Sequence, residues 1–147
     1  MFDSIVLEFN ERRHSVRGRL ALSYEEDNEI ISLGKGNESI IMRRDVYRGL
    51  NSTQFFFFLD YDKDDMLSEI EIHRCEGIEV LSVSFTFDDE LDSVALELSK
   101  YSEISILSQG EIFFKDLKMV ISDKRKMGGE GSTIGYFYCA SDVSHIG

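Results

Sequence analysis

Proline and tryptophan are both absent from this sequence of 147 residues. Turns without proline have to be made by Gly, Asn, Asp and Ser, which tolerate the backbone angles that turns require. These residues gather at four places, which we interpret as loops: 34–37, 49–52, 60–65 and 128–132. No stretch has the composition of a linker or a low-complexity tract, so we expect a single domain over residues 1–147.

Cysteine is also scarce, and no long apolar run occurs. Cys75 and Cys139 are isolated in the sequence, which predicts two free thiols in a reducing compartment, with one disulfide as the open alternative. No run approaches the roughly 20 apolar residues of a membrane helix, and the first residues lack the basic start of a signal peptide. We therefore expect a cytoplasmic protein that does not bind membranes.

Basic residues are few: 16 Lys and Arg stand against 28 Asp and Glu, which makes the net charge −12. Residues 60–97 hold 13 of the acidic residues and only Lys63 and Arg74 as basic ones, a net charge of −11. Such a charge repels nucleic acid and anionic lipid, and it favours a basic protein or a metal ion as the partner. Solubility alone is the alternative explanation.

Apolar patterning predicts an α+β fold with a mainly antiparallel β-sheet and two or three short helices. The clearest helix is 88–100, with apolar residues at the i, i+3, i+4 and i+7 spacing. A capping-box pattern, Ser23 followed by Glu26, predicts another helix over 24–33. Residues 38–49 fit a helix and a strand equally well.

Alternating or β-rich apolar runs predict the strands of this sheet. They lie at 5–9, 16–22, 54–61, 68–74, 78–87, 104–107, 111–122 and 133–140. A weak internal echo is also present, because a strand leads into an acid-capped helix at 20–33 and again at 83–100. Two similar halves are therefore an alternative form of the α+β fold.

Residues 60–71 admit two interpretations. Asp60, Asp62, Asp64 and Glu71 stand at positions 1, 3, 5 and 12 of an EF-hand calcium loop, where carboxylate oxygens bind Ca²⁺. Position 6, where the sharp turn needs glycine, is Asp65, and the flanking residues follow the β pattern rather than a helical one. We favour a β-hairpin with a polar turn and keep a Ca²⁺-binding module as the alternative.

Residue types used in catalysis are present without a recognisable spacing. His14, His73 and His145 are isolated, and no nucleophile elbow, phosphate-binding loop or dinucleotide fingerprint occurs. No zinc spacing is present either. We therefore predict a non-enzymatic protein without a cofactor or metal, and a small enzyme whose site assembles only in three dimensions is a further alternative.

Four arginines near the N-terminus do not indicate nucleic-acid binding. They are Arg12, Arg13, Arg17 and Arg19, and acidic residues nearby offset their charge. No aromatic residues are interleaved with them to stack on bases. We interpret these arginines as a solvated strand edge or as members of internal ion pairs with the acidic segment 60–97.

The middle and C-terminal parts of the chain resemble immunity proteins of contact-dependent inhibition and related polymorphic-toxin systems. The resemblance rests on Phe57-Phe-Leu-Asp-Tyr-Asp-Lys-Asp-Asp-Met-Leu-Ser-Glu-Ile-Glu-Ile72, on the helix 88–100 and on Gly110-Glu-Ile-Phe-Phe-Lys-Asp-Leu117. In many such relatives the turn carries Asp-Gly, where this chain has Asp64-Asp65. The resemblance implies a protein that binds a cognate toxin domain tightly and blocks its active site.

Many toxins of this kind are basic nucleases, so the resemblance agrees with the localised acidity. A carboxylate patch can occupy a cleft that evolved for phosphates and can steer association. We expect the partner-binding surface to comprise Asp60, Asp62, Asp64, Asp65, Glu69, Glu71, Asp89, Glu90 and Asp92.

Overall fold

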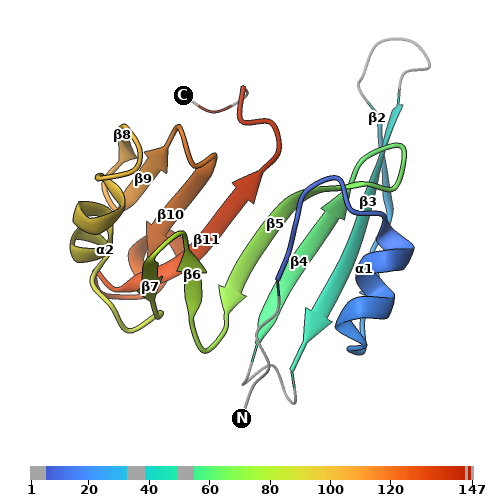
Figure 1. Ribbon diagram of the computed structural model, residues 1–147, viewed down its shortest axis with the longest axis horizontal. Coiled ribbons are helices and arrows are strands. Elements are labelled where there is room, and N and C mark those ends of the chain that lie inside the picture. Colours follow the sequence, from blue (N-terminus) through green and yellow to red (C-terminus); the bar gives the residue numbers. More distant parts are fainter. Residues whose placement is uncertain (1–5, 33–38, 50–54, 145, 147) are drawn as a thin grey trace.

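The protein is built on one long antiparallel sheet of nine strands, in the order β1-β3-β4-β5-β11-β10-β9-β8, with β2 also paired to β3 (Figure 1). The computed structural model describes residues 6–32, 39–49, 55–144 and 146, and for 29–32 and 39–41 it describes the backbone only. The sheet strands are β1 Glu25–Glu26, β2 Glu29–Ser32, β3 Ser39–Arg48, β4 Phe56–Tyr61, β5 Leu67–Arg74, β8 Ile104–Ser108, β9 Glu111–Phe114, β10 Met119–Asp123 and β11 Ile134–Ala140.

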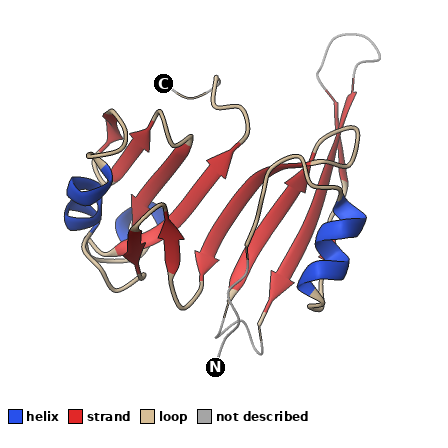
Figure 2. Ribbon diagram, in the orientation of Figure 1, coloured by secondary structure: helices blue, strands red, loops and turns tan. Residues whose placement is uncertain are grey.

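Three helices and a separate hairpin complete the described fold. They are α1 Arg13–Leu20, α2 Leu91–Leu98, the 3₁₀ helix η2 Lys124–Met127, and the hairpin of β6 Ile78–Val80 with β7 Val83–Phe85. Figure 2 shows that strands dominate the molecule and that the helices are short. The prediction of an α+β fold with a mainly antiparallel sheet is therefore confirmed. None of the described helices has the length and apolar character needed to cross a membrane.

Both α-helices and the β6–β7 hairpin pack on the same face of the sheet, and they form two apolar cores. One core joins Val16 of α1 to Tyr47, Leu59 and Ile70 of the strands β3, β4 and β5. The other joins α2 and the hairpin to strands β9, β10 and β11. The strand pair β5–β11 links the two groups of strands into one sheet.

The structure confirms several sequence-based predictions in the middle and C-terminal parts. Strands β4, β5, β8 and β11 lie within about two residues of the predicted ranges. The undecided segment 38–49 is the strand β3. The helix predicted over 88–100 is α2, which begins only at Leu91 because Glu90 is its N-cap.

The predictions for residues 16–33 were wrong. Most of the expected strand 16–22 lies in α1, and the described part of the expected helix 24–33 forms β1 and β2. The Ser23 capping box does not start a helix, because the following backbone pairs with β3 from Glu25 onward. The proposed internal duplication required a helix at 20–33 to match the one at 83–100. Because the described residues of the predicted helix 24–33 form no helix, the structure does not support this duplication.

Three other predicted strands are divided or absent. The expected strand 78–87 is the β6–β7 hairpin, with Leu81 at φ 55° in its turn. The expected strand 111–122 is two strands, β9 and β10, separated by a turn in which Lys118 has φ 54°. The described part of 5–9 contains no strand, although Leu7 and Phe9 still pack against the core.

Candidate functional site

The helices α1 and α2 and the β6–β7 hairpin all pack on one face of the sheet. We call the opposite face the open face. Neighbouring side chains of a strand point to opposite faces, and Phe57 and Leu59 point to the helices. Val143 and Ile146 pack against one end of the open face. Its central strands β3, β4, β5 and β11 carry Arg44, Val46, Arg48, Phe56, Phe58, Asp60, Glu69, Glu71, His73, Tyr136 and Tyr138.

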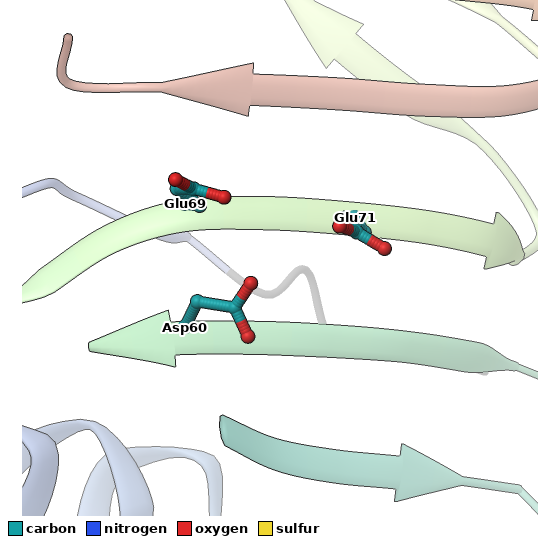
Figure 3. Close-up of side chains that lie close together, drawn as sticks. All are labelled: Asp60, Glu69 and Glu71. Atoms are coloured by element: carbon teal, nitrogen blue, oxygen red, sulfur yellow. The ribbon is translucent and has the colours of Figure 1, made fainter. Parts of the chain in front are cut away.

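Three carboxylates meet in the middle of the open face. Asp60, Glu69 and Glu71 each place one carboxylate oxygen within 4.8 Å of an oxygen of the other two. Figure 3 shows Asp60 on β4 and directed towards β5, which carries both glutamates. Asp60 and Glu69 are direct cross-strand partners. Like charges placed opposite each other across two strands are destabilising, so a positive charge nearby stabilises this cluster.

Arg44 of β3 supplies the positive charge next to this cluster. Its Nε and Nη2 donate hydrogen bonds to the two oxygens of Asp60 at 2.7 and 3.0 Å, and its Nη2 lies 3.4 Å from Glu71. Burial raises the pKa of Asp60, and the hydrogen bonds from Arg44 oppose that rise. Arg44 pairs with Asp60 and Glu71, and the formal charge of the three carboxylates exceeds that of its one guanidinium.

Aromatic rings surround the carboxylates. The His73 ring lies 5.1 Å from Phe58, 5.1 Å from Tyr136 and 5.5 Å from Phe56, measured between ring centroids. Arg44 stacks over Phe58 at 4.7 Å, and Arg48 stacks over Phe56 at 4.6 Å. Burial and the charge of Glu71 together raise the pKa of Tyr136, so its hydroxyl stays protonated at neutral pH.

The turn between β4 and β5 confirms the predicted hairpin. The Asp62 carboxylate accepts hydrogen bonds from the backbone N–H groups of Asp64 and Met66, at 2.9 and 3.0 Å. Asp65 takes the left-handed conformation, with φ 59°, which glycine adopts most readily. Aspartate tolerates this conformation better than most residues, which is why the turn can form without glycine.

The four predicted calcium ligands are only partly brought together. Asp60 and Glu71 belong to the carboxylate cluster, but its third member is Glu69, and Asp62 is engaged by the backbone of the turn. The flanking segments are strands rather than the helices of an EF-hand. The carboxylate cluster offers oxygen ligands that Ca²⁺ prefers, but Arg44 already holds Asp60.

The remaining predicted partner-binding acids lie elsewhere. Asp89, Glu90 and Asp92 surround the start of α2, and Figure 1 shows α2 and the β4–β5 turn at opposite ends of the long axis. Asp89 accepts a hydrogen bond from the Thr86 N–H at 2.8 Å, and Ser132 donates one to Glu90. The acidic segment 60–97 therefore does not form one continuous surface.

Arg13 and Arg17 form internal ion pairs with Asp45, which lies outside the acidic segment, and Arg13 also pairs with Asp65 of that segment at 3.8 Å. Asp45 of β3 is completely buried on the helix-covered face and accepts hydrogen bonds from Arg13 at 2.6 Å and from Arg17 at 2.7 Å. Arg19 pairs with Glu11 near the surface, at 2.6 Å. Arg13 and Arg17 thus attach α1 to the sheet, and Arg19 lies on the surface of this helix.

An apolar groove of about 650 Å³ lies on the helix-covered face above the β5–β11 pair, and both cysteines line it. Burial raises the pKa of Cys75, and it raises the pKa of Cys139 to about 12. Both cysteines are free thiols, and a raised pKa disfavours the reactive thiolate. His73 packs against Phe56, Phe58 and Tyr136 of the open face, so it does not line this groove.

Sequence reasoning missed the residues that complete the open face, namely Arg44, Arg48, Tyr136 and Tyr138. The period-two alternation of β11 was a usable signal for the tyrosines, but the undecided segment 38–49 concealed both arginines. Comparison of the chain with protein-family models, with curated proteins and with solved structures finds no match.

Proposed function

We propose that this chain is a non-enzymatic immunity protein, which binds a basic toxin domain through the open face and blocks its active site in the cytoplasm. The observation that carries the proposal is the cluster of Asp60, Glu69 and Glu71 beside Arg44, on the sheet face opposite the helices. The resemblance to immunity proteins and the net charge of −12 support it.

The surroundings of the cluster suit a protein partner better than a small ligand. Aromatic residues and arginine are enriched at the centres of protein interfaces, and this face carries four aromatic side chains near the carboxylates: Phe56, Phe58, Tyr136 and Tyr138. A lysine or arginine of the partner would meet Glu69 and Glu71 beside these rings. The aromatic side chains would supply the apolar contact area around such a charge pair.

The charge of the face also predicts how binding would respond to salt. Complementary charges accelerate association by long-range attraction, and salt screens this attraction within about 8–10 Å. Association with a basic toxin domain should therefore slow markedly between low and physiological ionic strength. Dissociation should change less, because it depends on the desolvated contacts at the centre of the interface.

The test uses the double variant Glu69→Gln/Glu71→Gln and the toxin domain encoded next to this chain's gene. Cells that express the toxin domain should grow when the wild-type chain is present and should lose that protection with the double variant. The purified variant should bind the toxin domain at least about 100-fold more weakly, because two charge-assisted contacts are lost.

The matched control is Asp89→Asn/Asp92→Asn, which removes the same charge at the opposite end of the molecule. It should protect cells as the wild type does. If both double variants protect equally, the open face is not the binding surface. If the neighbouring gene product is harmless and does not bind the wild-type chain, the immunity role itself is wrong. Circular dichroism verifies that each variant is folded.

A further inference from the structure

The two ends of the sheet are protected very differently. At one end, β1 consists of Glu25 and Glu26, both exposed. At the other end β8 pairs with β9, and none of the described strands pairs with its outer edge. The five residues of β8 have the sequence Ile-Ser-Ile-Leu-Ser and carry no charge. Charged residues and prolines are the usual devices that stop an edge strand from pairing with another chain, and β8 has neither.

Apolar side chains are unusually exposed at this edge. Ile106 is 76% exposed and Ile104 is 42% exposed, and on α2, at the same end of the sheet, Leu96 is 71% exposed. Single exposed apolar residues are common, but here two of them occur at alternate positions of one edge strand. Both isoleucines point to the helix-covered face, because their β9 partners Phe114 and Ile112 belong to that core.

The backbone of β8 offers hydrogen-bonding groups along the same edge. The Lys115 N–H donates to the Glu103 carbonyl at 3.2 Å, just before the strand begins. In an antiparallel ladder, every second residue directs both backbone groups to its neighbour and the residues between direct them away. Continuing from Glu103, Ser105 faces β9, and Ile104 and Ile106 direct their N–H and C=O groups outward.

We propose that β8 is the pairing edge for a second copy of this chain, with a two-fold axis through Ser105. In this antiparallel register, Ile104 of each copy stands opposite Ile106 of the other, and their outward N–H and C=O groups form the new ladder. The isoleucines of both copies meet on one face. The contact uses only the regular part of β8, before the irregularity between Ile106 and Ser108.

The uncharged β8 edge lowers the repulsion that opposes pairing with a second copy. Two chains of charge −12 repel each other, so they associate most easily through surfaces on which no carboxylates face one another. In the register above, Glu103 stands opposite Leu107, and the two Glu103 residues are separated by about 13 Å along the strand. That separation exceeds the screening length of about 8 Å at physiological ionic strength.

The dimer would leave the open face accessible. A two-fold axis perpendicular to the sheet joins the two sheets into one and keeps both open faces on the same side. Because the strand contact is short, we expect a weak dimer with a Kd of about 0.1 mM. The inference does not depend on the proposed immunity role.

Sedimentation equilibrium of the wild-type chain between about 10 μM and 1 mM is the first test. We expect a reversible monomer–dimer equilibrium, and the Ile106→Lys variant should raise its Kd at least about tenfold because lysine guards the edge. Leu81→Lys is the matched control, since Leu81 is 59% exposed in the β6–β7 turn. A wild-type monomer at 1 mM, or equal association of Ile106→Lys and wild type, overturns the proposal.

A second measurement tests the register and does not depend on the stability of the charged variant. Residues on the two-fold axis form a non-hydrogen-bonded pair with Cα atoms about 4.5 Å apart, which is within the range for a disulfide. Ser105→Cys should therefore form a covalent dimer under mild oxidation much faster than Ser84→Cys, whose site is an exposed strand serine in β7. Equal rates of cross-linking would contradict the proposed axis.

Discussion

Arg44 and Asp60 are direct cross-strand partners on β3 and β4, and the guanidinium holds the carboxylate with two hydrogen bonds, at 2.7 and 3.0 Å. Asp60 is only 8% exposed. A bidentate pair of this kind is stronger than a single ionic contact, and it also brings positive charge to Glu71. The pair therefore has two roles, since it joins two strands and partly neutralises the cluster.

Replacement of Arg44 should test the first role. Arg44→Gln removes the cation that pairs with Asp60 and Glu71, so we expect the free energy of unfolding to fall by about 2–3 kcal/mol. This is somewhat less than the roughly 3–5 kcal/mol for breaking a fully buried pair, because the Arg44 side chain is 18% exposed. Urea unfolding measures it. The double variant Arg44→Gln/Asp60→Asn should recover part of the loss, and no recovery would mean that the pair is not coupled.

Asp45 anchors α1 to the sheet, and its loss should be more costly. Asp45→Asn leaves Arg13 and Arg17 without their shared carboxylate, and Arg13 is only 7% exposed. We expect a loss of about 3 kcal/mol in urea unfolding. Glu11→Gln is the control, because it breaks the more exposed pair with Arg19 and should cost less than about 1 kcal/mol. Equal effects of the two variants would contradict the anchoring role.

The same carboxylate should make the protein sensitive to acid. Burial alone would raise the pKa of Asp45, but hydrogen bonds from Arg17 and Arg13 outweigh it and hold that pKa below its usual range. The unfolded chain then binds a proton at higher pH than the folded one. This stabilisation is complete above the ordinary aspartate range and is lost as the pH falls from that range through the lower pKa of folded Asp45. Wild type should lose more stability than Asp45→Asn between about pH 5 and pH 2. Parallel losses would show that other carboxylates control acid unfolding.

Position 110 requires glycine, because its backbone lies too close to the buried carboxylate of Asp123 to leave room for a side chain. A Cβ at this position would lie 2.4 Å from an oxygen of Asp123, which is completely buried and caps η2. We expect Gly110→Ala to cost about 3 kcal/mol or more in thermal or urea unfolding. Gly128→Ala is the matched control, because Gly128 has a similar φ of 84° and open space around it. It should cost only about 1–2 kcal/mol.

The two thiols should react slowly with a disulfide reagent at pH 7. Burial raises the pKa of Cys139 to about 12 and also raises the pKa of Cys75, so almost no thiolate is present in the folded chain. We expect Cys139 to react at least about tenfold more slowly than the same residue in urea, and single Cys→Ser variants separate the two sites. Rapid reaction of Cys139 in the folded chain would be inconsistent with its burial.

The central hairpin could be predicted because its signals are local. The alternation of Ile70 and Ile72 with Glu69 and Glu71 identifies a strand with one apolar face, and Asp62 and Asp65 supply the chemistry of a tight turn. The sheet then places Glu69 and Glu71 on one face with Asp60. Half of the candidate site therefore follows from a pattern that spans only about a dozen residues.

The helix α1 could not be predicted in the same way. Its buried residues are Arg13 and Val16, so the residue that decides its orientation is an arginine and not part of an apolar stripe. The partner of Arg13 is Asp45, 32 positions later in the chain. Likewise, the capping box at Ser23 had to compete with pairing to β3, and a contact between distant segments decided the outcome.

The sequence by itself determined the acidity of the chain, the antiparallel character of the sheet and the hairpin at 60–71, because charge, alternation and turn chemistry are properties of neighbouring residues. Only the tertiary structure decided that Arg44 contacts both Asp60 and Glu71, that the acids near α2 lie at the other end, and that β8 is left as an uncharged edge. Those outcomes depend on strand order and register, which are set by packing between segments far apart in the chain.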